Sequence, residues 1–189
     1  AYLVTNFAAP QAGREATMTH DEVTTLFHEF GHTLHHILTA QTEPQVSGIN
    51  GVEWDAVELP SQFLENFAWE HEIVKSISAH VETGEQLPDE LFDKMIAAKN
   101  YEAGAFCVRQ VEFALFDMLL HSAFDPKTDS VQALLDSVRR EVAVVFPPAW
   151  NRFPQSFSHI FAGGYGAGYY SYKWAEVLSA DCFSAFEEE

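Results

Sequence analysis

Two histidines one helical turn apart, with a glutamate directly after the first of them, are the residues of this sequence best suited to do chemistry. They lie in the run His28-Glu29-Phe30-Gly31-His32. On an α-helix, residues i and i+4 project from the same face, so both imidazoles can reach one metal ion. Glu29 lies about 100° around the helix from His28, where it can approach a metal-bound water without taking a ligand position. The spacing therefore predicts a zinc-binding helix with Glu29 beside the metal.

A catalytic zinc ion normally has three protein ligands and one open position, so a third ligand is needed. A third histidine six residues after the second is excluded, because Leu38 occupies that position. We expect a carboxylate from the following helix, and the candidates are Glu53, Glu58 and Glu65. Glu58 and Glu65 are seven residues apart and would share a helical face. We favour Glu58 as the ligand and Glu65 as a support for the ligands.

A segment rich in glycine and tyrosine, residues 157–172, suggests a second kind of chemistry. Its glycines let the backbone approach a ligand closely. One histidine and several tyrosines supply hydrogen-bond donors, which are His159, Tyr165, Tyr169, Tyr170 and Tyr172. Such donors can stabilise the negative charge that builds on a carbonyl oxygen in a transition state. A tyrosine-rich packing surface is the alternative interpretation.

Helices are the elements that must position these residues. Thr19 and Glu22 match a capping box, and apolar residues follow at helical spacing as far as Leu38, which predicts the helix that carries both histidines. A second helix is predicted over about residues 55–78, with Pro60 in its first turns, where a missing N–H matters least.

The rest of the chain predicts further helices and little else. They cover about residues 88–124, with a possible break at Gly104, then 130–146 and 169–186, whereas 150–168 is expected to be irregular. Residues 1–7 are rich in β-formers and predict a strand. The expected fold is mainly α with a small β component near the N-terminus. Residues 1–189 show no repeat or linker and are expected to form one catalytic region.

The composition is that of a packed, acidic protein. Its hydrophobic content is 47% and its formal net charge is -18, which disfavours nucleic acid as a partner. No apolar run approaches the roughly 18 to 20 residues that span a bilayer, so no membrane partner is expected. The two cysteines form no metal-type pair or disulfide framework, which favours a reducing, cytoplasmic compartment. Since the chain begins at Ala1 without methionine, we expect it to be part of a longer protein.

The sequence resembles the thimet oligopeptidase family of zinc metallopeptidases over essentially its whole length, and is most similar to a bacterial branch of that family. Three long stretches carry the resemblance: THDEVTTLFHEFGHTLHH, VSGINGVEWDAVELPSQFLENFAWE and FSHIFAGGYGAGYYSYKWAEVLSADCF. The resemblance implies an almost wholly helical, zincin-type catalytic region with a small sheet beside the active-site helix. It also implies a monomer whose substrates are short peptides, admitted to a deep channel.

The resemblance also assigns roles to individual residues. One Zn²⁺ ion would be held by His28, His32 and Glu58, with Glu29 as general base. The implied transition-state donors are His159, Tyr165 and Tyr172, and the implied substrate-binding residues are Gly163, Gly164 and Tyr169.

The activity implied in this way is hydrolysis of internal peptide bonds in short oligopeptides. A dipeptidyl carboxypeptidase of the same family is one alternative, since it would share these residues but recognise a C-terminal carboxylate. An inactive zinc-binding fragment or interaction module is an alternative of a different class, and the intact Glu29 disfavours it.

Overall fold

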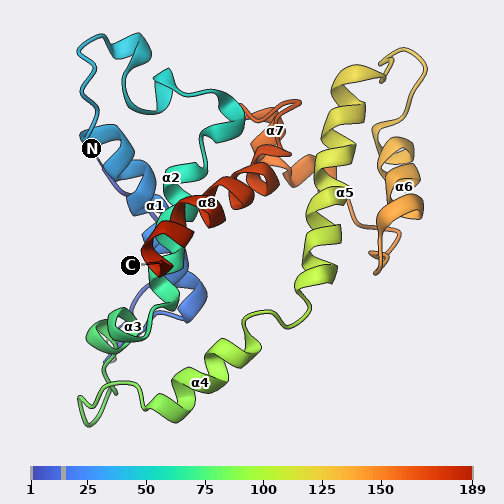
Figure 1. Cartoon of the computed structure of the whole chain (residues 1–189). Helices are drawn as coiled ribbons and strands as arrows, with labels where there is room; N and C mark the ends of the chain where they lie inside the picture. The colour runs from blue at the N-terminus through green and yellow to red at the C-terminus, as the bar shows by residue number, and fades with distance from the viewer. Residues whose placement is uncertain (1, 14–15, 189) are drawn as a thin grey trace. The chain divides into compact units, whose positions relative to one another are not determined.

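The computed structural model describes residues 2–13 and 16–188, and its regular elements there are helices (Figure 1). The predicted mainly α class is therefore confirmed. The α-helices are α1 (His20–Ile37), α2 (Leu59–Glu65), α3 (His71–Ile77), α4 (Asp89–Ala98), α5 (Ala103–Ser122), α6 (Val131–Val142), α7 (Ser158–Phe161) and α8 (Ser171–Glu187). Short 3-10 turns connect several of them: η1 (Pro44–Val46), η2 (Gly48–Gly51), η3 (Trp54–Ala56), η4 (Asn66–Trp69) and η5 (Phe153–Ser156).

The β component predicted near the N-terminus is not supported. Residues 2–10 have no regular structure, and the first residue of the predicted strand lies outside the described residues. Tyr2 and Val4 are 98% and 80% exposed. A strand needs a neighbouring strand to complete its backbone hydrogen bonds, and the described residues contain none.

The metal-site helix begins where the capping signal predicts. The Thr19 hydroxyl accepts a hydrogen bond from the Glu22 amide, and the Glu22 carboxylate accepts one from the Thr19 amide. This reciprocal pair satisfies two backbone N–H groups at the start of α1. The helix then runs for 18 residues without interruption, so His28 and His32 lie in the middle of a regular helix.

The second predicted helix is shorter than expected. Instead of one helix over about 55–78, the chain forms η3, α2, η4 and α3 in succession. Pro60 lies in the first turn of α2, as predicted. The Asn66 side chain donates to the backbone oxygens of Gln62 and Phe63, at 3.3 and 3.0 Å. A side chain that occupies the last carbonyl groups of α2 competes with continuation of the helix.

The later helices are close to their predicted positions. The predicted helix over 88–124 is divided into α4 and α5, and the break at residues 99–102 comes just before Gly104. Glu102 has a φ of 55°, a left-handed conformation that a regular helix does not contain. The helix predicted over 130–146 ends earlier, at Val142. No helix in the described part of the chain combines the length and apolarity that crossing a bilayer requires.

The chain forms two compact units, which are described separately. Unit 1 comprises Ala1–Ala98 and Ala175–Glu189. In it, α1 and α2 lie side by side (Figure 1). The α8 residue Phe183 contacts the rings of Phe63 and Phe67 in an edge-on arrangement. The α1–α2 pair is the part of unit 1 that carries the candidate metal ligands.

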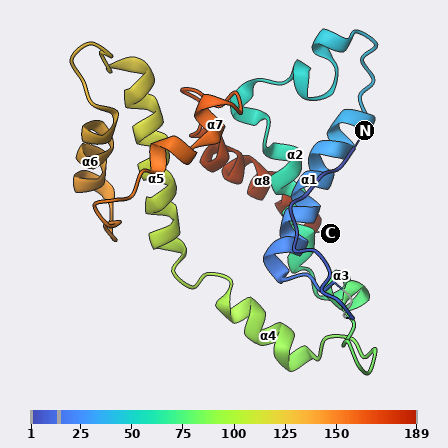
Figure 2. The same ribbon diagram turned by 180° about the vertical axis from the view of Figure 1, so that it is seen from behind.

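Unit 2 comprises Lys99–Trp174, and α5 and α6 pack side by side in it (Figure 2). Its core is apolar and aromatic and contains Phe116, Leu135, Val138, Phe157, Ile160 and Tyr169. Three of these residues, Phe157, Ile160 and Tyr169, belong to the glycine- and tyrosine-rich segment. That segment contains only short helical turns before α8, as expected, and packing against the core holds it in place.

Candidate metal centre

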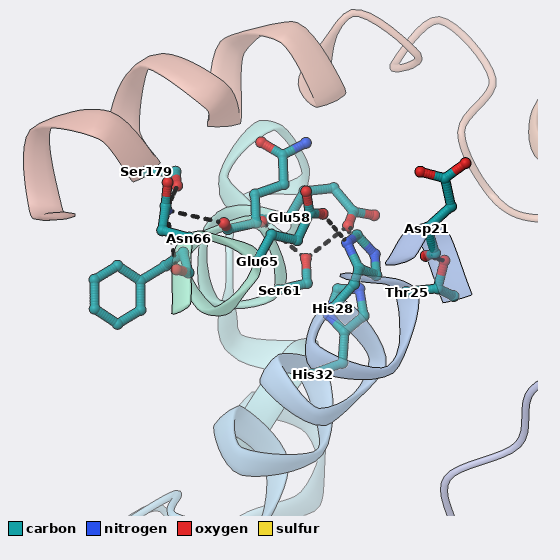
Figure 3. A network of polar contacts seen from close by, with 11 residues as sticks. Asp21, Thr25, His28, His32, Glu58, Ser61, Glu65, Asn66 and Ser179 are labelled. Atoms are coloured by element: carbon teal, nitrogen blue, oxygen red, sulfur yellow. Dashed lines mark hydrogen bonds and ion pairs between the residues drawn. The ribbon is translucent and has the colours of Figure 1, made fainter. Parts of the chain in front are cut away.

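Unit 1 brings His28, His32 and Glu58 together, with one ligand atom of each lying within 4.8 Å of the others. The Glu58 Oε2 atom lies 3.2 Å from His28 Nε2 and 3.1 Å from His32 Nε2. Figure 3 shows both imidazoles leaving α1 and pointing toward the Glu58 carboxylate. The Glu58 side chain is 1% exposed, whereas the two histidines are 20% and 22% exposed. The three donors thus converge at a point that is open on the histidine side.

Neighbouring polar groups orient these donors. Glu65, at the end of α2, accepts a hydrogen bond of 2.6 Å from His28 Nδ1. The Ser61 hydroxyl lies 2.9 Å from Glu58 Oε2 and donates to this carboxylate. A proton held on Nδ1 by Glu65 leaves Nε2 as the ligand atom of His28. Glu53, the third carboxylate candidate, is exposed and does not belong to the converging group.

The charge state of His28 depends on these carboxylates. Burial lowers the pKa of His28, but hydrogen bonds and Coulomb attraction from Glu58 and Glu65 outweigh it and raise this pKa to about 9. Without a metal, His28 therefore carries a proton at neutral pH. A metal ion binds only the deprotonated imidazole, so its binding must release that proton.

The glycine of the motif allows the two helices to approach each other. Gly31 is the buried residue of α1. A Cβ atom added to it would lie 2.4 Å from the Pro60 backbone oxygen and 2.5 Å from the Ser61 Cα. Only a residue without a side chain fits at this crossing, nearly one turn after His28. The spacing of the motif residues does not by itself indicate this role of Gly31. The contact of Ser61 has a local signal, because Ser61 follows Glu58 by three residues, a spacing that places side chains near one another.

The candidate donors of the glycine- and tyrosine-rich segment form a separate group, in unit 2. The rings of Tyr165 and Tyr172 are stacked at a centroid distance of 5.1 Å. The exposed His159 ring lies 6.0 Å from Tyr165 and 5.8 Å from Tyr172, again between centroids. The two tyrosine rings therefore lie against each other, although only Tyr172 belongs to α8.

The glycine-rich loop next to this group is exposed at Gly163 and Gly164. Gly164 has a φ of 85°, which favours glycine. Tyr169 differs from them, since its side chain is in the core and only 8% exposed. Its hydroxyl donates to Gln110 at 2.9 Å. Burial raises the pKa of Tyr169 to about 12, although Arg109 opposes the shift. These contacts give the Tyr169 side chain a packing role, and its contact with substrate stays a prediction.

Comparison with known proteins places the chain among peptidases. The model of peptidase family M3 matches residues 1–189. Oligopeptidase A of Salmonella typhimurium is 60% identical over 190 residues, which cover 100% of this chain and 28% of that protein. Organellar oligopeptidase A of Arabidopsis thaliana is 51% identical over 189 residues, covering 100% of the chain and 24% of that protein. A dipeptidyl carboxypeptidase of Escherichia coli is 36% identical over 194 residues, which cover 100% of this chain and 28% of that protein. The chain therefore spans between 24% and 28% of the length of these relatives.

Proposed function

Because this chain belongs to peptidase family M3, we propose that it forms the catalytic part of a zinc metallopeptidase that hydrolyses internal peptide bonds in short oligopeptides. The observation that carries the proposal is the convergence of His28, His32 and Glu58. Their helix also carries Glu29, next to the first histidine.

The donor set fits Zn²⁺. Two imidazole nitrogens and one carboxylate oxygen are a ligand set of catalytic zinc sites, which keep a fourth position for water or substrate. The buried Glu58 oxygen already lies close to both Nε2 atoms. When bound, zinc would polarise the scissile carbonyl group and lower the pKa of its water from 15.7 toward about 7.

Glu29 is the proposed general base. It lies on α1 directly after His28, on a different side of the helix from the two ligands. Its carboxylate takes the proton of the attacking water and then delivers it to the leaving amine. A carboxylate that held the metal itself could not move this proton, which is why the base and the ligand Glu58 are different residues.

The proposed role of unit 2 is to stabilise charge on the substrate. Tyr165, Tyr172 and His159 donate hydrogen bonds to the carbonyl oxygen of the substrate as it becomes negative. Their mutual ring contacts support a single group of donors. The exposed backbone of Gly163 and Gly164 lies close to them in the chain and is proposed to contact the substrate.

Zinc removal tests this function in the complete protein that contains the chain. Chelation should abolish peptide cleavage, and added zinc should restore it. Glu58→Gln should weaken zinc binding, whereas Glu53→Gln, an exposed change just before η3, should leave it unchanged. Full cleavage activity after exhaustive metal removal, verified by elemental analysis, would contradict the proposal. Zinc binding without any peptide cleavage would also contradict the proposal and would indicate a zinc-binding module instead.

The two candidate peptidase activities differ in the group that they require at the C-terminus of the substrate. A dipeptidyl carboxypeptidase needs a free C-terminal carboxylate, whereas an endopeptidase does not. The higher identity to the two oligopeptidases, 60% and 51% against 36%, favours the endopeptidase. Equal cleavage of a peptide and its C-terminal amide would support it. The proposed protein acts as a monomer on short peptides in the cytoplasm, where cysteines stay reduced.

A further inference from the structure

Asp117 is a buried carboxylate on α5 that the proposed chemistry does not use. Its side chain is 1% exposed. An ionised carboxylate is costly to bury unless several donors compensate for the lost water. The donors that surround Asp117 therefore indicate what this residue does.

Two of these donors are backbone amides of the glycine-rich loop. The amide of Ala167 donates to Asp117 Oδ1 at 2.9 Å, and that of Tyr169 donates to Oδ2 at 3.0 Å. His121, one turn further along α5, lies beside the same residue: its Nδ1 is 2.9 Å from the Asp117 backbone oxygen, with which it shares a hydrogen bond, and 2.8 Å from Oδ1. Both carboxylate oxygens are thus occupied, and the loop bonds join positions 50 and 52 residues apart.

The bound loop section has a backbone that needs external support. Ala167 has a φ of 57°, a left-handed conformation that residues with a side chain rarely adopt. The neighbouring Gly166 lies close to α5, because a Cβ atom at this position would be 3.1 Å from His121 Nε2. The Asp117 carboxylate therefore holds the loop against α5 just where the loop conformation is unfavourable.

The fixed section lies between the two proposed donor tyrosines. Ala167 follows Tyr165 by two residues, and Tyr169 precedes Tyr172 by three. The stacked arrangement of Tyr165 and Tyr172 thus depends on the path of the backbone between them. Oxyanion stabilisation requires donors held in place before the reaction, since misplaced donors lose most of their effect.

We propose that Asp117 is a positioning residue: its buried carboxylate holds the loop at Ala167 and Tyr169 and thereby sets the positions of the Tyr165 and Tyr172 hydroxyls. This role rests on the proposed function, in which these hydroxyls donate to the substrate. This role differs from a purely stabilising one, because loss of the Asp117 carboxylate should lower kcat through displacement of the two tyrosine hydroxyls.

Asp117→Asn tests the proposal in the zinc-loaded complete protein. Asparagine keeps the shape but has a single acceptor oxygen, so its NH₂ group must face one of the two loop amides. We expect kcat to fall roughly 10- to 100-fold, the equivalent of a lost hydrogen bond to a charged group, with KM and zinc content unchanged. Amide hydrogen exchange at Ala167 and Tyr169 should accelerate.

A double-mutant cycle separates positioning from stability. In a Tyr165→Phe, Tyr172→Phe background, Asp117→Asn should cost little further kcat, because the hydroxyls it positions are gone. Glu112→Gln is the matched control. Glu112 is equally buried on the same helix but pairs with Arg109 and Arg139 instead of the loop. Its effects should be on stability, be additive with the tyrosine changes, and leave exchange at Ala167 and Tyr169 unchanged.

If the asparagine variant does not fold, Asp117→Glu keeps the charge but displaces both oxygens by one methylene, and kcat should still fall about 10-fold. Unchanged amide exchange, or additive effects in the cycle, would overturn the positioning role while leaving the proposed function intact. Absence of zinc-dependent cleavage in the unmodified protein would instead overturn the proposed function, and the positioning role with it.

Discussion

One oxygen atom of Glu58 lies within 3.2 Å of a nitrogen of each motif histidine, and this proximity is the strongest feature of the site at the scale of single residues. A buried carboxylate beside two imidazoles provides negative charge where a divalent cation would compensate for it. Ser61 and Glu65 fix the carboxylate and one imidazole by hydrogen bonds. The site is therefore held in a ligand geometry by protein contacts alone.

Glu29→Gln should keep zinc but lose nearly all turnover. Glutamine preserves the size and shape of the side chain and cannot accept a proton, and general bases contribute about 10²–10⁴-fold to rate. Zinc content and kcat of the purified variant, measured together, check this. Loss of zinc in Glu29→Gln with zinc retained in Glu58→Gln would mean that the two glutamates have exchanged roles.

Tyr165→Phe and Tyr172→Phe should each lower kcat on the order of 10²-fold, with little change in KM or zinc affinity. Each change removes one hydroxyl and keeps the ring, so the stacked contact survives. A donor that acts mainly in the transition state affects kcat more than substrate binding. Steady-state kinetics of both variants would show wild-type kcat if the tyrosines only pack.

At the scale of elements, the site depends on how closely α1 and α2 approach each other. Gly31 allows backbone contact between them, and α2 carries Glu58 at its N-terminal end and Glu65 at its last position. Gly31 is not itself a ligand. Because it has no side chain, α1, which carries the histidines, can approach α2, which carries the carboxylates, closely enough for the ligands to meet.

Gly31→Ala should weaken zinc binding and lower the free energy of unfolding. The new methyl group would meet the Pro60 and Ser61 backbone, and such overpacking costs about 1–3 kcal/mol. Gly104→Ala is the matched control, because Gly104 is also helical but a Cβ added there would meet no neighbouring atom within 4 Å. Since alanine favours helix by up to about 1 kcal/mol, this control should lose no stability. Urea unfolding and zinc titration of both variants make the comparison, and equal behaviour would contradict the close-approach argument.

At the scale of the whole molecule, the two kinds of site residue belong to different units. The three candidate ligands are in unit 1, whereas His159, Tyr165 and Tyr172 are in unit 2. Changes in the three ligands of unit 1 should therefore act on zinc affinity, whereas changes in Glu29 or in the unit 2 donors should act on kcat. The chain also spans only 28% of the bacterial relative, so whole-protein properties belong to the complete protein.

The complete protein should cleave short, unfolded peptides and spare folded proteins. The family resemblance motivates this expectation, because a deep and narrow channel admits only chains without tertiary structure. A matched pair of substrates checks it: a stably folded protein, and a synthetic peptide that corresponds to one of its exposed loops. Rapid cleavage of the folded member, observed by mass spectrometry, would contradict the size limit.

Local patterns in the sequence determined the helical class, the start of α1 and the metal motif. Each depends on interactions between residues a few positions apart: the Thr19–Glu22 capping box, the i, i+4 spacing of His28 and His32, and Pro60 in a first turn. The same local view failed at residues 2–7, where strand propensity has no partner strand, and over 55–78, where the Asn66 amide competes for the carbonyl groups of α2.

The sequence favoured Glu58 as the ligand and Glu65 as its support, but only the tertiary structure shows how these carboxylates meet the histidines and that Ser61 contacts Glu58. Glu53, Glu58 and Glu65 are chemically alike, and the helix crossing at Gly31 brings Glu58 to both Nε2 atoms and Glu65 to Nδ1 of His28. The bonds from Asp117 to the glycine-rich loop join positions about 50 residues apart and follow no sequence period. Residues on one helix recur at a regular spacing, so the sequence reveals which of them share a face. Contacts between separate elements depend on how those elements pack, and no regular spacing in the sequence predicts them.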